Sequence, residues 1–295
     1  MLRVHRSNRA ERLLDSLAEL VAVPLPDPFL RETVVVQGRG MERWLSLELA
    51  RRLGVWANAW FPFPRTLLIE AMRVALGEET VRSGAAFEPE VLVWRIAGLL
   101  PALEKKPEFA PIRSYLAGDH RGVRRLQLAS EIAAVFDRYV IYRPELVAAW
   151  ERGRSDRGDP WQSILWRELA GESPTHLARR VERLTARLRE GSWELAGFPP
   201  RISVFGISTI APLYLRALEA LSAATDVHLF LLAPSREFMG ATVRPRQEAR
   251  LREAQLELFA RPDLHLERGN PLLDSLGKLG REFQELLEDV SYVEG

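Results

Sequence analysis

The sequence contains no cysteine, five histidines and only three lysines among its 41 basic residues. The absence of cysteine excludes disulfides, thiolate nucleophiles and cysteine-ligated zinc, and five scattered histidines argue against a histidine-based metal site. No apolar run approaches the roughly 18 residues that span a membrane, and the amino terminus lacks the apolar segment of a signal peptide. The sequence therefore predicts a cytoplasmic protein.

The composition is typical of a globular protein with a substantial core. Of the 295 residues, 47% are hydrophobic and 27% are charged, and this length allows one large domain or two of ordinary size. The net charge of +1 gives no bulk electrostatic argument for a nucleic-acid partner. The preference for arginine has two interpretations: a GC-rich genome, or the use of guanidinium forks to hold phosphates and carboxylates.

Residues 1–78 predict the first part of an α/β core. Residues 2–5 indicate a short strand, Ser7 and Asn8 the cap of a helix with leucines at helical spacing, and residues 34–36 a buried strand. Strands that alternate with helices form parallel sheets with right-handed crossovers. We therefore expect a parallel sheet.

The turn after the second strand lies where an ATPase carries its phosphate loop. A Walker A loop ends in Lys, which binds the β- and γ-phosphates, and in Ser or Thr, which binds Mg²⁺. Here Met41 and Glu42 follow Gly40, and the nearest lysine is Lys105. The strand that would supply Mg²⁺-binding acids continues instead with Gly-Ile-Ser-Thr at 206–209. The sequence thus predicts a nucleotide-binding fold without a functional ATP site, although the glycines can also simply permit a tight turn.

Residues 79–198 predict an inserted, all-helical subdomain. Apolar residues recur at helical spacing, and no strand-like alternation interrupts them. The helical stretches are 92–100, 126–150, 161–169 and 176–189.

Residues 199–295 predict the second part of the core. Strands are expected at 202–208 and 226–233, with a helix between them. A surface helix at 244–268 and a final helix ending near Leu287 follow. No domain end is evident, so we expect the chain to be part of a longer protein.

Arginines form two clusters that could hold phosphates, and exposed aromatic residues could stack on unpaired bases. Glu182 and Glu190 lie inside the second cluster at spacings that allow ion pairs, which favours a solvated helix face there. The first cluster comprises Arg113, Arg121, Arg124, Arg125, Arg138 and Arg143, and the second comprises Arg179, Arg180, Arg183, Arg187 and Arg189.

No catalytic group of residues is evident. Asp156 and Asp159 lie in a Gly/Arg-rich loop and Asp137 lies in a helical stretch, and none has a partner at a convincing spacing. The sequence has no Gly-x-Ser-x-Gly elbow. We interpret each lone acid as a helix cap or an ion-pair partner.

Six short motifs occur in order along essentially the whole chain. They are Met1-Leu-Arg-Val with Ser7-Asn8-Arg9; Val36-Gln37-x-x-Gly40-Met41-x-x-Trp44-Leu45; Phe61-Pro62-x-Pro64; Phe136-Asp137-x-Tyr139-x-x-Tyr142-Arg143-Pro144; Phe205-Gly206-Ile207-Ser208; and Gly269-Asn-Pro-Leu-Leu273 with Gly277-Lys-Leu-Gly-Arg281. Together they resemble the amino-terminal part of the RecC family, the gamma subunits of exodeoxyribonuclease V, the RecBCD complex. Each motif is modest alone, and six collinear ones are specific.

The resemblance implies a superfamily 1 helicase-like fold of the P-loop NTPase type that lacks a functional ATP site. It implies a non-catalytic scaffold and DNA-channel subunit that holds RecB-like and RecD-like subunits together, helps to split the duplex and guides single-stranded DNA in double-strand break repair. In some members the strand is scanned for the recombination hotspot Chi. ATP and Mg²⁺ would be used by the partner subunits, so no cofactor is expected in this chain.

The resemblance also implies that this chain forms one wall of the strand channel. Glutamine can read base edges, arginine can hold phosphates and phenylalanine can stack on bases. The wall would comprise Gln37, Arg39, Arg43, Phe63, Val135, Asp137, Arg138 and Arg143. Where the family pattern has an aromatic, an acidic and a basic residue, this chain has Ile69, Ala134 and Leu177. These departures favour strand guidance over reading of the same hotspot sequence.

The alternative is an autonomous nucleotide-binding enzyme or NTPase with an atypical phosphate loop. Arg39, within Gly38-Arg39-Gly40, is the local cation that could replace the missing lysine. Nucleotide binding would separate the two hypotheses.

Overall fold

The computed structural model describes residues 1–154, 160–172, 174–191, 197–207, 209–233 and 278–295. The chain divides into two compact units. The first comprises Met1–Leu67, Pro199–Ile210 and Leu221–Gly295, and the second comprises Leu68–Phe198 and Ala211–Ala220. The domain boundaries expected near residues 78 and 198 stay predictions.

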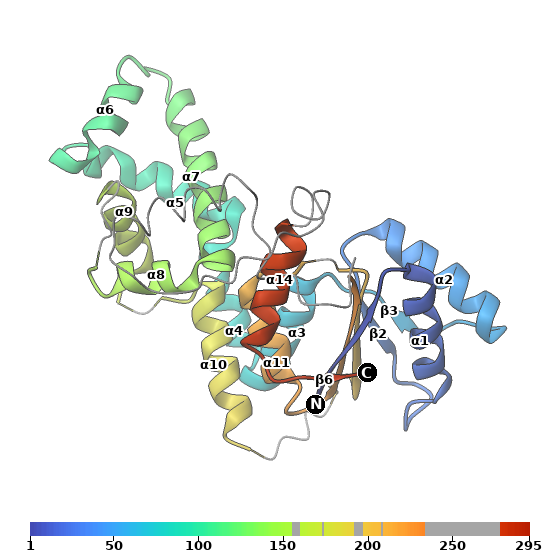
Figure 1. Ribbon diagram of the computed structural model, residues 1–295. Helices are drawn as coiled ribbons and strands as arrows, with labels where there is room; N and C mark the ends of the chain where they lie inside the picture. Colours follow the sequence, from blue (N-terminus) through green and yellow to red (C-terminus); the bar gives the residue numbers. More distant parts are fainter. Residues whose placement is uncertain (155–159, 173, 192–196, 208, 234–277) are drawn as a thin grey trace, which may run out of the picture. The chain divides into compact units, whose positions relative to one another are not determined.

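The first unit is built on one parallel sheet with the strand order β3-β2-β4-β5-β1-β6 (Figure 1). Every described strand pair is parallel, which confirms the predicted α/β class and the parallel sheet. The strands are β1 (Leu2–Ser7), β2 (Glu32–Val35), β3 (Ala59–Trp60), β4 (Arg201–Phe205), β5 (Asp226–Leu232) and β6 (Val293–Glu294).

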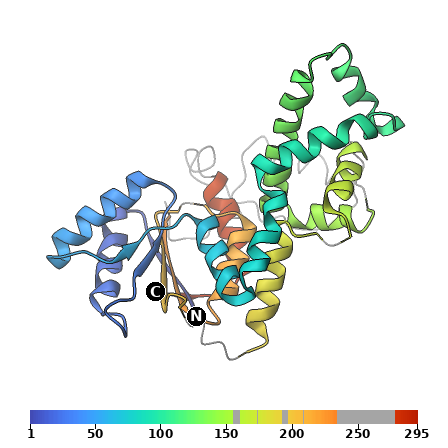
Figure 2. The ribbon, with the colours of Figure 1, turned by 180° about the vertical axis from the view of Figure 1, so that it is seen from behind.

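The central strands have near-continuous apolar sequences because both faces of the sheet are covered. β4 is buried along its whole length, and β5 is exposed only at its two ends. Figures 1 and 2 show α1 (Ala10–Ala22) and α2 (Arg39–Leu53) on one face and α14 (Lys278–Glu288) on the other.

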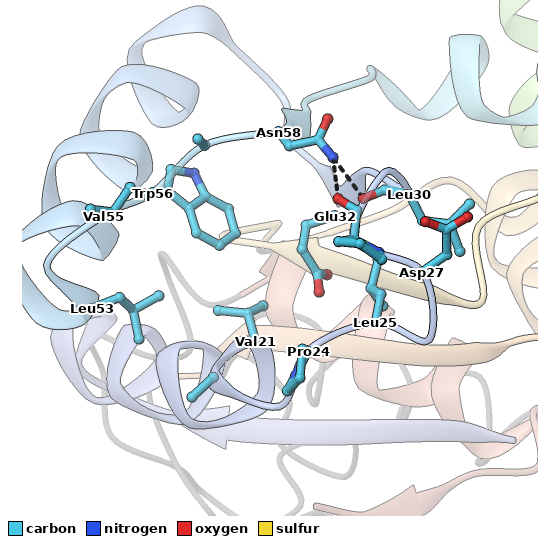
Figure 3. A pocket seen from close by; sticks show the side chains of 13 residues that line it. Val21, Pro24, Leu25, Asp27, Leu30, Glu32, Leu53, Val55, Trp56 and Asn58 are labelled. Carbon is cyan, nitrogen blue, oxygen red and sulfur yellow. Dashed lines mark hydrogen bonds between the residues drawn. The ribbon is translucent and has the colours of Figure 1, made fainter.

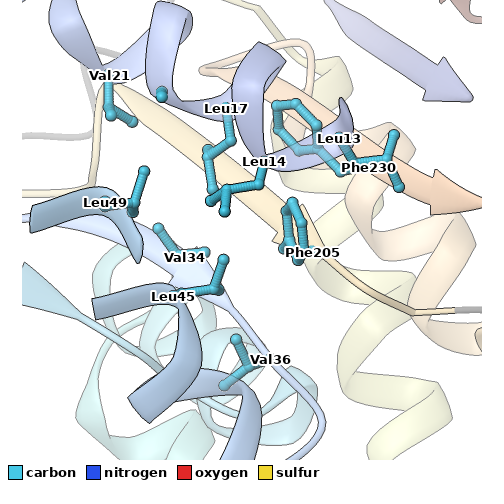
Figure 4. Close-up of a cluster of buried hydrophobic side chains, with 11 residues drawn as sticks. Leu13, Leu14, Leu17, Val21, Val34, Val36, Leu45, Leu49, Phe205 and Phe230 are labelled. Atoms are coloured by element: carbon cyan, nitrogen blue, oxygen red, sulfur yellow. The ribbon is translucent and has the colours of Figure 1, made fainter. Parts of the chain in front are cut away.

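The main hydrophobic core of this unit lies between the sheet and the pair α1 and α2 (Figure 4). Leucines of α1 recur at positions that share one face of a helix, and they meet Val34, Phe205 and Phe230 from three neighbouring strands. Burying each such side chain contributes about 1.5–3 kcal/mol relative to leaving it exposed. This packing holds α2 in place at the end of β2.

Arg201 joins three elements beneath this core. Its guanidinium pairs with the carboxylate of Glu32 on β2. It also donates to the carbonyl oxygens of Leu20 (2.8 Å) and Val23 (3.0 Å) at the end of α1. The last carbonyl groups of a helix have no partner within the helix, so a buried arginine on β4 satisfies them here.

Two local predictions differ from the structure. The helix expected to be capped at Ser7 or Asn8 begins at Ala10, and its N-cap residue, Arg9, makes no side-chain capping bond. The reason is that Ser7 still pairs with Leu232 in the sheet, so the chain leaves the strand later than its sequence indicates. The two-residue strands β3 and β6 were not expected, because neither has a periodic pattern of its own.

Two other expected helices lie partly or wholly among residues that the structure does not describe. The surface helix expected at 244–268 lies outside the described residues. Of the final helix, the structure describes α14, Lys278–Glu288, which places Phe283 and Leu287 in the interior.

In the described residues between β3 and β4, the regular elements are all helical. They are α3 (Pro64–Leu76), α4 (Glu78–Ser83), a 3₁₀ turn (Gly84–Phe87), α5 (Pro89–Leu103), a second 3₁₀ turn (Pro107–Phe109), α6 (Ala110–Leu116), α7 (Val123–Tyr142), α8 (Pro144–Glu151), α9 (Pro160–Ala170) and α10 (Leu177–Arg189). After β4, α11 (Pro212–Leu221) carries Arg216, which pairs with Glu145 of α8. No helix in the described part of the chain has the length and apolarity needed to cross a membrane.

A buried carboxylate links three helices of the second unit. Glu151 ends α8, and its side chain is 8% exposed. It accepts hydrogen bonds from Trp166 Nε1 (3.2 Å), His176 Nε2 (2.7 Å) and Arg179 Nε (2.8 Å). Burial alone would raise the pKa of Glu151, but the bonds from His176, Arg179 and Trp166 outweigh it and lower this pKa to about 2.

We expect Glu151→Gln to lower the free energy of unfolding by about 3 kcal/mol at pH 7, because Arg179 then loses its buried countercharge. Since the folded-state pKa of about 2 lies below the reference value of 4.5, the charge stabilises the fold fully above about pH 4.5. That contribution disappears as pH falls towards 2. Urea unfolding from pH 7 to pH 3 should show a steeper loss for the wild type than for the variant.

The matched control is Glu182→Gln, which removes a 55%-exposed partner of the same Arg179. It should cost less than about 1 kcal/mol, because exposed ion pairs contribute little. If the stability of the wild type and that of Glu151→Gln depended equally on pH, the charge of Glu151 would not stabilise the fold as proposed.

Candidate functional site

The parallel strands β2 and β4 are neighbours in the sheet, with Val34 opposite Ser203, and the chain leaves them towards opposite sides of the sheet. After β2 the chain continues through α2 to β3 on one side, and after β4 it continues through α11 to β5 on the other side. Open α/β sheets bind ligands at such a switch point, beyond the carboxyl ends of the strands. We therefore take the ends of β2 and β4 as the candidate site.

The β2 side of this site is a short turn into α2. Val36 is buried, whereas Gln37, Arg39 and Arg43 are exposed. Gly38 is the N-cap residue of α2, and its carbonyl oxygen accepts the N–H groups of Met41 (3.1 Å) and Glu42 (3.2 Å). The exposed polar side chains of the turn therefore face solvent from a helix start that the core holds in place.

A hydrogen bond connects the two sides of the site. Gln37 Nε2 donates to the carbonyl oxygen of Thr209, which follows β4, over 3.2 Å. The bond leaves the side-chain carbonyl oxygen of Gln37 without a partner among the described residues. A glutamine held by one end of its amide presents an acceptor in a defined direction.

The glycine at the end of β4 is required by both its backbone and its surroundings. Gly206 has a φ of +68°, and its N–H donates to the carbonyl oxygen of Phe230 over 3.2 Å. A Cβ atom built on Gly206 would lie 2.8 Å from Cε of Met41. Met41, which stands where a Walker A loop has lysine, thus extends an uncharged side chain across the switch point.

Charge in the first turn of α2 disfavours a phosphate ligand. Glu42, in the position of the Mg²⁺-binding Ser or Thr, is half-buried within that turn. A carboxylate at a helix start interacts favourably with the helix dipole. It occupies the positive end that a phosphate would need, and it repels a polyanion.

Phe63 lies at the same edge of the sheet. The N–H of Val36 donates to the carbonyl oxygen of Pro62 over 3.1 Å, so the segment after β3 runs beside the end of β2. The next residue, Phe63, is 44% exposed. The structure therefore brings Gln37, Arg39, Arg43 and Phe63 together in the first unit.

The other four predicted residues belong to the second unit. Val135 and Asp137 are half-buried on α7, and Arg138 is exposed, with Nε donating to the carbonyl oxygen of Ala134 over 3.3 Å. Arg143 is exposed between α7 and α8. Their contact with DNA stays a prediction.

A pair of histidines escaped the sequence analysis because its members are 223 residues apart. His5 Nε2 on β1 lies 3.1 Å from His228 Nδ1 on β5, and the His5 ring stacks on Phe230 with centroids 4.5 Å apart. Burial, His5 and Arg3 lower the pKa of His228 to about 4, so this ring is neutral at pH 7. In the residues that the structure describes, no group of three potential metal ligands occurs.

A pocket of about 630 Å³ lies at the opposite end of β2, between the ends of α1 and α2 (Figure 3). Two of its polar side chains have partners within the protein, whereas the buried Nε1 of Trp56 has none among the described residues. Asn58 donates to the carbonyl oxygens of Pro28 and Leu30, and Glu32 pairs with Arg201. None of the predicted channel residues lines it, so the switch point remains the candidate site.

Comparison with known proteins identifies one family. A family model described as "RecC, N-terminal domain" matches residues 2–294. Proteins named RecBCD enzyme subunit RecC are 33% identical in Escherichia coli, 30% in Haemophilus influenzae and 34% in Mycobacterium tuberculosis, over 98%, 97% and 97% of this chain. The chain spans 28%, 30% and 26% of those three proteins. These matches confirm the resemblance that the six motifs indicated.

We expect Gly206→Ala to lower the free energy of unfolding by about 1–3 kcal/mol, because a side chain at positive φ is strained and its Cβ would displace Met41. Gly40→Ala is the matched control, since Gly40 lies in α2 with no atom within 4 Å of a built Cβ. It should be neutral or stabilising by up to about 1 kcal/mol. Urea unfolding measures the free energy of unfolding of both variants. Equal effects would contradict the close approach of Met41 to Gly206.

Proposed function

The chain belongs to the RecC family, and from this membership we propose that it acts as a non-catalytic scaffold and DNA-channel module of a RecBCD-type helicase and nuclease. In this proposal it works in the cytoplasm with RecB-like and RecD-like subunits, in the recombinational repair of double-strand breaks. ATP and Mg²⁺ are used by the partner subunits, and the fold of the first unit is that of a superfamily 1 helicase without a functional ATP site.

The observation that carries the proposal is the content of the switch point. A working ATPase needs lysine and a hydroxyl there to hold the phosphates and Mg²⁺. This chain has Met41 packed towards Gly206 and Glu42 in the first turn of α2. The site therefore offers an apolar side chain and a negative charge, which support a structural role and argue against hydrolysis.

The exposed residues at the same edge support contact with a single strand. Arg39 and Arg43 can hold phosphates, and Phe63 can stack on a base. Such stacking contributes about 1–3 kcal/mol per base without regard to sequence. In the second unit, the residues proposed to contact the strand are Val135, Asp137, Arg138 and Arg143.

Strand guidance is better supported than Chi scanning. Gln37 could read a base through the carbonyl oxygen that its bond to Thr209 leaves free. However, Leu177, where the family pattern has a basic residue, is buried in the second unit with 3% exposure. We therefore propose guidance of the strand as the function and scanning as a capacity of some relatives.

The first test is a calorimetric titration of the chain with Mg²⁺ and a non-hydrolysable ATP analogue. No binding up to millimolar concentration is expected, because the switch point lacks the phosphate-binding lysine. Micromolar binding that Arg39→Ala abolishes would instead make the chain a nucleotide-using enzyme.

A second test addresses the channel in the assembled complex. The pair Arg39→Ala and Arg43→Ala should weaken single-strand binding and lower the slope of log affinity against log salt by about 1.4, since each lost phosphate contact removes about 0.7. Arg143→Ala should lower it by about half as much. Equilibrium binding of a labelled oligonucleotide at several salt concentrations measures this.

Arg51→Ala is the matched control, because Arg51 lies at the other end of α2 and is 73% exposed. It should leave the salt slope unchanged. The channel assignment fails if the Arg39 and Arg43 variant behaves like this control.

A further inference from the structure

Basic side chains gather at one end of the second unit. We call residues 104–125 the helical tip; it runs from the end of α5 through α6 to the first turn of α7 (Figure 1). The tip has six basic residues against three acidic ones, although the whole chain has a net charge of only +1. It includes two of the three lysines in the sequence, Lys105 and Lys106.

Part of the tip's charge serves the fold. Asp119 Oδ2 accepts the N–H of Arg125 over 2.9 Å and so caps the start of α7. Arg113 donates to the carbonyl oxygen of Glu104 over 2.6 Å, which ties α6 to the end of α5. Lys106 lies 3.4 Å from Glu168, an exposed pair of little energetic weight.

Arg121 and Arg124 have no such role. Both are exposed, and neither has an ion pair or a side-chain hydrogen bond among the described residues. The acid nearest in sequence, Asp119, already caps α7 through its carboxylate. Arg124 interacts with the charge of Asp119 without forming an ion pair or a side-chain hydrogen bond with it, so both guanidinium groups keep free donors at the surface.

The other arginine-rich helix, α10, contrasts with the tip. Arg179 pairs with Glu151 and Glu182, and Arg187 pairs with Glu190. Arg180 is 2% exposed, and its guanidinium fills the space beside Gly84. Three of the five arginines of α10 are thus used within the protein, and the pairs with Glu182 and Glu190 are those that the glutamate spacing predicted. Arg183 and Arg189 are exposed, as Arg121 and Arg124 are.

An aromatic ring is exposed in the same segment. Tyr115 on α6 is 51% exposed, and the apolar side chains of Val123 and Leu126 on α7 are 54% and 39% exposed. Basic groups and an exposed aromatic within one segment form a combination that can bind a nucleic-acid strand, with phosphates on the guanidinium forks and a base on the ring.

We propose that the helical tip is a second nucleic-acid contact, in which Arg121 and Arg124 bind the phosphodiester backbone and Tyr115 stacks on an unpaired base. Guanidinium forks without partners fit phosphate oxygens in two-point contacts. A surface of this kind binds by releasing counterions, so its affinity depends on salt and not on sequence. The proposal stands apart from the switch-point site, because it uses none of the residues proposed for the channel.

The test compares salt slopes for the 295-residue chain with a fluorescent duplex and a fluorescent single strand. Arg121→Ala with Arg124→Ala should lower the slope by about 1.8 on duplex and about 1.4 on single strand, from about 0.9 and 0.7 per contact. Arg121→Lys with Arg124→Lys keeps the charge and should keep the slope. Tyr115→Ala should weaken single-strand binding by at least fivefold and leave duplex binding unchanged, which distinguishes the two ligands.

The matched control is Arg12→Ala with Arg31→Ala, which removes the same charge from exposed positions of the first unit. The control should leave the slope unchanged. An equal loss in both double variants, or no loss in the tip variant, overturns the proposal.

The channel proposal and the tip proposal can be tested separately. If Arg39→Ala with Arg43→Ala weakens binding and the tip variant does not, the tip proposal is wrong and the channel proposal is supported. The opposite result supports the tip proposal and contradicts the channel proposal. Thermal unfolding of each variant confirms that these exposed substitutions leave the fold intact.

Discussion

The pairing of β2 with β4 is the contact on which the rest of the first unit depends. It joins Val34 to Ser203, although β3 and the helices from α2 to α10 lie between them in the sequence. Parallel neighbours place their carboxyl ends at the same edge, so this one pairing brings the turn at Gln37 beside Gly206 and Thr209. The candidate site, its hydrogen bond and the Met41 contact all follow from that neighbourhood.

Arginine is used in three distinct ways in this chain. Arg201 is buried and satisfies both a carboxylate and the last carbonyl groups of α1. Arg179 joins α10 to the buried Glu151. Arg39 and Arg121, by contrast, are exposed. The same five donors of a guanidinium serve the interior in the first two cases and are available to a ligand in the last, so the abundance of arginine alone indicates neither use.

Local pattern predicted most elements, and the exceptions have a common cause. The leucines of α1 and the apolar runs of β4 and β5 identify their own conformation, because periodicity and burial are properties of a short segment. β3 and β6 have no such pattern and become strands only by pairing with Glu32 and Arg3. Ser7 resembles a helix cap but is held in β1 by Leu232. Each exception is a residue whose state is set by a distant partner.

The sequence by itself determined the fold class, the helical nature of the segment between the two halves of the core, the missing phosphate-loop lysine and, through six collinear motifs, the family. It did so because each of these depends on residues close together in the chain. Only the tertiary structure decided the strand order, the Gln37 to Thr209 bond, the His5 and His228 pair, and which arginines are free. These depend on contacts between residues far apart in sequence, and no local pattern specifies which distant segment a strand or a side chain will meet.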